Sequence, residues 1–245
     1  MLIPGIVSAT FKNLSIDDVI AITRRNKLKA IEWSENHHIE LGNTMQASAV
    51  KEKCLDAGVA IASYGSYYRL GKGMDFRKSL DNVIAIGSER IRIWAGDKPS
   101  SAVADDEYEL LVKEAQQISA IAADNGIMVC LEWHKNTLTD RNQSGLKFLN
   151  DVDCSNFRTF WQPSPEMDVE ERCEGIKMVS KFIENIHVYY WDNTGRRPLS
   201  EGESDWKRYM KLFGPEDHYA LLEFVKDNTI VQFSSDASAF LSWLN

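Results

Sequence analysis

A single-domain α/β fold, the (β/α)8 TIM barrel, is predicted by three features of this 245-residue sequence. Short apolar runs alternate with longer segments of helical period, eight such pairs follow one another, and no composition break or low-complexity linker divides them. Alternation of this kind predicts parallel strands, and eight units in about 250 residues is the usual size of such a barrel. We therefore expect one domain over residues 1–245.

The predicted strands are short apolar runs, several of them rich in β-branched or aromatic residues. In chain order they are Ile3–Ala9, Leu28–Trp33, Val59–Tyr64, Arg90–Trp94, Ile127–Trp133, Phe157–Gln162, Ile186–Trp191 and Tyr219–Val225.

The predicted helices between these strands have recognisable ends. Ser15 reads as an N-cap, and Asp17 and Asp18 follow it in the first turn, where acidic side chains favour a helix. Glycines placed to end helices follow the second, third and fourth of them. The helical segments are those after Ser15 and over Asn43–Ala57, Phe76–Ile86, Asp105–Asn125, Ser144–Val152, Val169–Ile183, Asp205–Phe213 and Asp236–Leu244.

The main rival fold is a doubly wound open sheet. Such sheets usually carry a glycine-rich phosphate-binding turn after the first strand. Here Thr10-Phe11-Lys12-Asn13 follows the first predicted strand and contains no glycine. The barrel is therefore the better prediction.

Composition and charge exclude several classes of protein. Lys and Arg number 28 against 36 Asp and Glu, a net charge of −8, which argues against a nucleic-acid partner. No apolar run approaches the roughly 20 residues of a membrane helix, and no signal peptide is readable. The four cysteines are scattered without a C-x-x-C pair, which is typical of reduced thiols, so we expect a cytoplasmic protein with no membrane partner.

The barrel prediction places the chemistry at the carboxyl ends of the strands. Polar residues expected there are Glu32, His37, His38, Glu132, His134, Gln162, His187 and Glu223. Because side chains alternate along a strand, Glu132 and His134 should point to the same side. Carboxylates and imidazoles suit Mn²⁺, Mg²⁺, Zn²⁺ or Co²⁺. The alternative is a purely structural role: a strand-end Glu can form a salt bridge with a neighbouring barrel residue, and a strand His can be hydrogen-bonded in the core.

Aromatic residues also gather at the predicted strand ends. Tryptophans end or nearly end five of the eight runs: Trp33, Trp94, Trp133, Trp161 and Trp191. A ring of aromatic side chains at a barrel mouth predicts an apolar-walled pocket for a carbohydrate-like ligand. Packing in the core or at the rim is the alternative for each of them.

These residues resemble the sugar phosphate isomerase/epimerase superfamily, the xylose-isomerase-like barrels, over nearly the whole chain. The resemblance rests on six segments that fall in the family's order on the expected strands. They are Ala30-Ile31-Glu32-Trp33 with His37-His38, Ile91 to Gly96, Leu131-Glu132-Trp133-His134, Ile186 to Asp192, Glu201 to Trp206, and Leu221-Leu222-Glu223.

The resemblance implies a divalent metal ion held by residues of four strands. Three of the family's ligands fall on Glu132, His187 and Glu223, and the fourth, an Asp in the family, falls on Gln162. A Gln amide oxygen can bind a cation but brings no negative charge. This departure implies weaker metal binding, altered reactivity or no metal.

The resemblance also implies a reaction, the isomerisation or epimerisation of a sugar or sugar-like ketose through an enediolate. Glu132 and Glu223 would be the paired acid and base, and the metal would stabilise the developing oxyanion. His38, His134 and Trp94 would contact the substrate, and Arg196 or Arg197 would hold a phosphate or carboxylate. Barrels of this family often pair, which implies a homodimer.

Two other functions stay open. Gln162 favours a non-catalytic sugar-binding barrel whose metal site has degraded. An abasic-site endonuclease shares the fold but needs a His-rich multi-zinc site and a cationic DNA surface. With five His and a net charge of −8, this chain fits that third function least.

Overall fold

The computed structural model describes residues 1–244, and within them eight parallel strands close a barrel. Around the barrel the order is β1-β10-β7-β6-β5-β4-β3-β2, and β1 pairs with both β2 and β10. This closure confirms the predicted barrel and excludes the open sheet. The strands are β1 (Leu2–Val7), β2 (Ala30–Ser34), β3 (Ala60–Arg69), β4 (Arg90–Trp94), β5 (Met128–Glu132), β6 (Phe157–Trp161), β7 (Ile183–Val188) and β10 (His218–Leu222).

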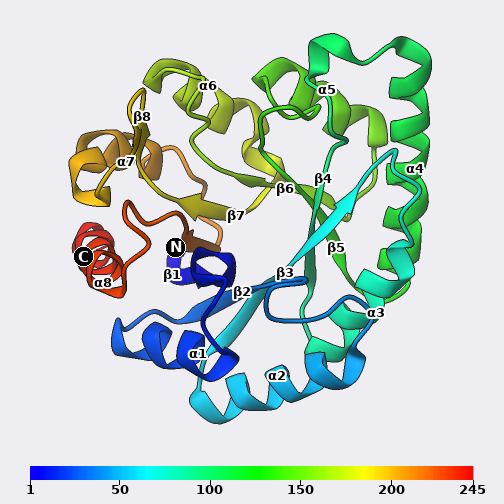
Figure 1. Cartoon of the computed structure of the whole chain (residues 1–245). Coiled ribbons are helices and arrows are strands. Elements are labelled where there is room, and N and C mark those ends of the chain that lie inside the picture. Colours follow the sequence, from blue (N-terminus) through cyan, green and yellow to red (C-terminus); the bar gives the residue numbers. More distant parts are fainter. Residues whose placement is uncertain (245) are drawn as a thin grey trace.

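Helices follow the strands and form the outer layer of the barrel (Figure 1). They are α1 (Ile16–Arg25), α2 (Thr44–Ala57), α3 (Phe76–Ile86), α4 (Asp105–Ala123), α5 (Asn142–Val152), α6 (Val169–Val179), α7 (Glu203–Met210) and α8 (Ile230–Trp243). The predicted start of the first helix is confirmed, because Ser15 and Asp18 form a reciprocal capping box. Within residues 1–244, no helix combines the length and the apolar character needed to cross a membrane.

Several element bounds differ from the sequence prediction, and β3, for example, continues to Arg69 instead of ending at Tyr64. β7 ends at Val188, and the chain then forms a small antiparallel hairpin of β8 (Trp191–Asp192) and β9 (Gly195–Arg196). The last helix begins at Ile230 rather than Asp236, because the Thr229 side chain accepts a hydrogen bond from the Gln232 backbone N–H and caps it. The hairpin and the loop before α8 both lie at the carboxyl end of the barrel.

The predicted ring of five tryptophans at the mouth is wrong. Trp33, Trp133 and Trp161 are at most 1% exposed and face the helix layer. Trp161 packs edge-on against aromatic rings of α7. The reason is the two-residue period of a strand: since Glu32 and Glu132 face the barrel interior, the tryptophan after each must face outward.

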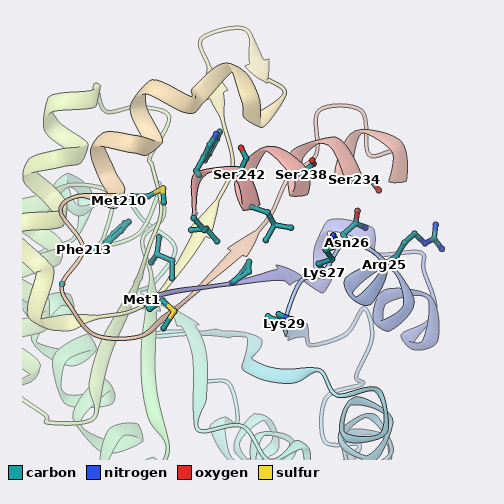
Figure 2. A pocket seen from close by; sticks show the side chains of 16 residues that line it. Met1, Arg25, Asn26, Lys27, Lys29, Met210, Phe213, Ser234, Ser238 and Ser242 are labelled. Carbon is teal, nitrogen blue, oxygen red and sulfur yellow. The ribbon is translucent and has the colours of Figure 1, made fainter.

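A cavity of about 920 Å³ opens at the amino-terminal end of the barrel. Figure 2 shows the side chains of Ser234, Ser238 and Ser242 along α8, with Arg25 and Lys29 across from them. The start of β1, the turn after α1, the end of α7 and the loop before β10 also line it. This end is opposite to the one where barrels of this kind place their chemistry, so the candidate site is sought at the carboxyl ends of the strands.

Candidate active site

Four side chains predicted as metal ligands converge at the carboxyl end of the barrel. Glu132 ends β5, His187 lies in β7 and Glu223 directly follows β10, and one ligand atom of each lies within 4.8 Å of the others. Gln162, the residue after β6, joins them: its Oε1 is 3.2 Å from His187 Nδ1. Its Nε2 donates to the Trp133 carbonyl at 2.7 Å, which turns the amide oxygen towards the cluster.

A buried ion pair forms the floor of the site. Arg92 Nε donates to Glu32 Oε1 at 3.0 Å, and Arg92 Nη1 pairs with Glu132 Oε2. Ser63 Oγ donates to the other oxygen of Glu32 at 2.7 Å. Sequence reasoning named Glu32 as a strand-end residue but gave neither it nor Arg92 a role. The available clue was the alternation of Arg92 with Ile91 and Ile93, which points the arginine into the barrel.

Glu32 also orients His187. Nε2 of the imidazole lies 3.2 Å from Glu32 Oε2, whereas Nδ1 faces Glu223 Oε2 at 3.3 Å. With the Nε2 proton donated to Glu32, a metal ion that displaced the Nδ1 proton would meet the Nδ1 lone pair beside Gln162 and Glu223. Histidines that bind metal ions commonly have this carboxylate support on the second nitrogen.

The electrostatics of the cluster favour a cation. Burial disfavours a charged imidazole, but the carboxylates of Glu32 and Glu223 outweigh it and raise the pKa of His187 to about 10. Burial likewise opposes ionisation of Glu32, yet His187 and Arg92 lower its pKa to about 2. Three glutamates, Glu32, Glu132 and Glu223, surround two cations, Arg92 and the protonated His187, so the cluster attracts positive charge.

The residues present fit a divalent metal ion. Ligand atoms lie roughly 2.0–2.6 Å from a bound ion, so two ligands of one ion stand up to about 5 Å apart, as found here. Glu132, His187 and Glu223 offer two carboxylates and one imidazole, and Gln162 offers a neutral oxygen. With the Arg92–Glu32 pair neutral and the Nδ1 proton of His187 displaced by the ion, two carboxylates and a divalent cation would sum to zero charge.

Trp94 forms one wall of the site. Its indole N–H donates to Glu132 Oε2, and the guanidinium of Arg69 lies 3.3 Å from the ring centroid. His134 stacks on Trp94 with centroids 5.4 Å apart and 22° between the ring planes. Because Trp94 contacts both Glu132 and His134, these two residues lie on the same side of β5, as the strand period predicts. Tyr67 meets Trp94 edge-on.

The structure does not bring His38 to this cluster. His38 is 4% exposed and packs against Trp33. The neighbouring His37 instead bonds the Tyr67 hydroxyl at 2.9 Å and so lies beside the aromatic wall. Asn36, with a φ of +62°, turns the chain just before the two histidines, which a strand-period argument could not foresee.

The two candidate arginines of the hairpin differ in their partners. Arg197 is paired within its own loop, with Glu201 at 2.5 Å and Asp192 at 3.5 Å. Arg196 instead lies over the rings of Trp191 and Phe224 and donates to Asn228 at 2.8 Å. Of the two, Arg196 therefore keeps a guanidinium without a carboxylate partner in residues 1–244.

Comparison with known proteins gives one curated relative and many similar structures. No family model matches the sequence. The curated relative is a 3-dehydroshikimate dehydratase from Bacillus anthracis, 25% identical over 256 residues, covering 91% of this chain and 90% of the relative.

The structural neighbours agree with one another on the fold. The probable 3-DHS dehydratase AsbF from Bacillus anthracis has a TM-score of 0.83 at 19% identity and covers 98% of this chain and 99% of its own. A xylose isomerase domain protein from Planctomyces limnophilus has a TM-score of 0.75 at 17% identity over 99% and 95% of the chains. A D-allulose 3-epimerase from Methylomonas sp. has 0.74 at 15% identity over 98% and 97%. The chain thus has the fold of the xylose isomerase-like TIM barrels.

Proposed function

We propose that this protein is a divalent-metal-dependent enzyme that removes a proton from the carbon beside the carbonyl group of a small polyhydroxylated ketone. The observation that carries the proposal is the convergence of Glu132, Gln162, His187 and Glu223 beneath an aromatic wall. When bound, the metal ion would act as a Lewis acid towards the carbonyl oxygen. Removal and return of the proton would be carried out by side chains of this chain.

The two catalytic glutamates differ in their freedom to move a proton. Glu132 Oε2 is held by both Arg92 and the Trp94 indole, which keeps that oxygen ionised and fixed in position. Glu223 lies at the rim, 9% exposed, with Oε2 facing His187. Glu223 is therefore the better placed of the pair to take the proton, and His134 rather than the ionised Glu132 would return one at another position.

Isomerisation or epimerisation is the first candidate outcome. Removal of the proton leaves an enediolate, and return of a proton to the opposite face or to the neighbouring carbon gives an epimer or an isomer. The likeness to a D-allulose 3-epimerase supports a carbohydrate as the substrate class. The rings of His134 and Tyr67, which pack around Trp94, offer apolar surface of the kind that sugar rings contact.

Dehydration is the second candidate, favoured by the curated relative and by the similarity to AsbF. Its first step is the same proton removal. The electron pair then expels a hydroxyl from the next carbon, which takes a proton and leaves as water. Both outcomes need the same cluster, so the position of a leaving hydroxyl in the substrate separates them.

Solvent exchange tests the shared step. In D₂O with Mn²⁺ or Mg²⁺, a panel of ketoses and 3-dehydroshikimate should include a compound that gains deuterium beside its carbonyl or loses water. Glu132→Gln and Glu223→Gln should each abolish this exchange in folded protein, whereas Arg197→Met should not. Tight sugar binding with no exchange or water loss for any compound would contradict the proposal and favour the sugar-binding barrel.

A further inference from the structure

A second recess lies at the same end of the barrel as the candidate metal site formed by Glu132, Gln162, His187 and Glu223. It has a volume of about 530 Å³ and is lined by residues 9–14 after β1, by Arg196 of the hairpin and by the loop that follows β10. The adjacency follows from the chain itself, because Phe224, which lines the recess, directly follows Glu223. We refer to it as the Lys12–Arg196 groove.

The groove is cationic in a chain that carries a net charge of −8. Lys12 and Arg196 both line it, and no acidic residue of the described chain is among its lining. Neither cation has an ion-pair partner within residues 1–244. The carboxylate of Asp227, next in sequence to the lining residue Asn228, accepts hydrogen bonds from the Thr229 hydroxyl and backbone N–H. Two unneutralised cations facing one recess predict an anionic occupant.

Arg196 is held in place for such a role. Its guanidinium lies 5.0 Å from the Phe224 ring centroid and 5.5 Å from that of Trp191, and Nη1 donates to Asn228. Stacking of this kind fixes the plane of the guanidinium while leaving its other N–H groups available. Arg196 would therefore bind an anion with a small loss of side-chain entropy.

Phe224, which lines the groove, has a strained backbone conformation. Its φ of +57° is unfavourable for a bulky residue. That conformation turns Glu223 towards His187 while the Phe224 ring packs on Tyr189 and Trp191 beneath Arg196. Strained residues of this type concentrate at functional sites.

We propose that the Lys12–Arg196 groove binds the anionic end, a phosphate or a carboxylate, of the substrate whose carbonyl end meets the metal cluster. Only the claim that the anion belongs to the substrate rests on the proposed function. Anion binding itself can be measured without turnover. The groove also lies close to the aromatic wall, because burial and the charge of Lys12 both lower the pKa of His37 at that wall. The substrate class is then a sugar phosphate or a hydroxylated keto acid.

Titrations with inorganic phosphate and with acetate, at a constant chloride concentration, test the groove and separate the two sources of anion. Binding is followed by calorimetry on the full chain with Mg²⁺ present. Tighter binding of phosphate indicates a sugar phosphate as the substrate, and tighter binding of acetate indicates a keto acid. Lys12→Met and Arg196→Met should each weaken that anion about tenfold, the usual loss for one charge-assisted hydrogen bond.

Arg197→Met is the matched control, because it removes the same charge from the same hairpin and should change affinity less than twofold. Glu223→Gln should abolish exchange beside the carbonyl yet leave anion affinity intact. The inference is overturned if neither anion binds, if Arg197→Met weakens binding as much as Arg196→Met, or if Glu223→Gln abolishes anion binding. Failure of the proposed function would show only as a lack of exchange or water loss with every ketone.

Discussion

Gln162 is the residue at which this site departs from a charged ligand set. Its amide oxygen points at the cluster because its Nε2 is tied to the Trp133 carbonyl and, at 3.4 Å, to Glu132 Oε1. The amide thus contributes geometry without charge. Metal affinity depends on both, so the charge at this position is a variable that mutation can isolate.

We predict that Gln162→Asp binds Mn²⁺ at least about tenfold more tightly than Gln162→Asn, a difference of about 1.4 kcal/mol. The two variants have side chains of the same length, so only the charge differs. Calorimetric titration of both, beside the native protein, measures the effect. Equal affinities would place residue 162 outside the ligand set.

In the proposed metal site, Glu32 would act through its contact with His187 rather than by binding the ion. Glu32→Gln should weaken Mn²⁺ binding by roughly 10–100-fold, because the imidazole loses the carboxylate that fixes its Nε2 proton. Glu35→Gln is a suitable control. Glu35 is an equally buried carboxylate of the same segment, but it accepts hydrogen bonds from Ser79 and the Tyr67 backbone instead. A similar loss in both variants would indicate a general effect of burial.

Arg92 stabilises two buried carboxylates in the barrel, those of Glu32 and Glu132, by forming an ion pair with each. Arg92→Met should lower the free energy of unfolding of the metal-free protein by about 3–5 kcal/mol, since Glu32 and Glu132 lose their partner. The double variant Arg92→Met/Glu32→Gln should recover part of this loss. Urea unfolding of the three proteins checks the prediction, and a double variant less stable than Arg92→Met would refute it.

At the scale of elements, the site depends on how closely the strands approach one another. β3 crosses the Glu32–Arg92 pair at Gly65, where a Cβ atom would lie 2.7 Å from Glu32 Oε1 and 2.8 Å from Arg92 Nη2. The strand must therefore lack a side chain at this position for the ion pair to form. α5 similarly meets the ring of Trp133 at Gly145, which lets the helix pack against the end of β5.

Gly65→Ala should consequently displace the ion pair, destabilise the protein by about 1–3 kcal/mol and weaken metal binding. Ala60→Val adds bulk to the same strand at an exposed position and should be nearly neutral. Thermal unfolding and Mn²⁺ titration of both variants test this. Retention of native metal affinity in Gly65→Ala would show that the pair is not needed to hold the cluster.

At the scale of the whole molecule, the candidate metal site and the Arg92–Glu32 pair beneath it join β2, β4, β5, β7 and the segments after β6 and β10. These elements are distant in sequence and meet only in the closed barrel, so a bound ion would contact the native state and not the unfolded chain. Binding confined to the native state stabilises it in proportion to the logarithm of ligand concentration.

Metal at about 100 times its dissociation constant should stabilise the fold by about 2.7 kcal/mol and raise the melting temperature by roughly 5–10 °C. Differential scanning calorimetry with and without a chelator measures the shift. In Glu223→Gln the shift should be much smaller. A melting temperature independent of metal in the native protein would contradict the proposed cofactor.

The sequence by itself determined the barrel, through local periodicity, and the barrel placed eight polar residues at the strand ends. The resemblance to the xylose-isomerase-like barrels then indicated which four of them form the cluster. Apolar runs and helix caps mark each unit, and the position of a residue at a strand end is a matter of counting. Glu132, Gln162, His187 and Glu223 converge for that reason.

Only the tertiary structure decided which neighbours take part. It selects His37 over His38 for the aromatic wall, Arg196 over Arg197 for the groove, and Trp94 among the five tryptophans for contact with Glu132. It also revealed the Arg92–Glu32 pair that supports His187. Strand alternation indicates that Arg92 points inward but not which carboxylates it meets. That choice and the others depend on loop conformation or on contacts between strands far apart in the chain, which local patterns do not specify.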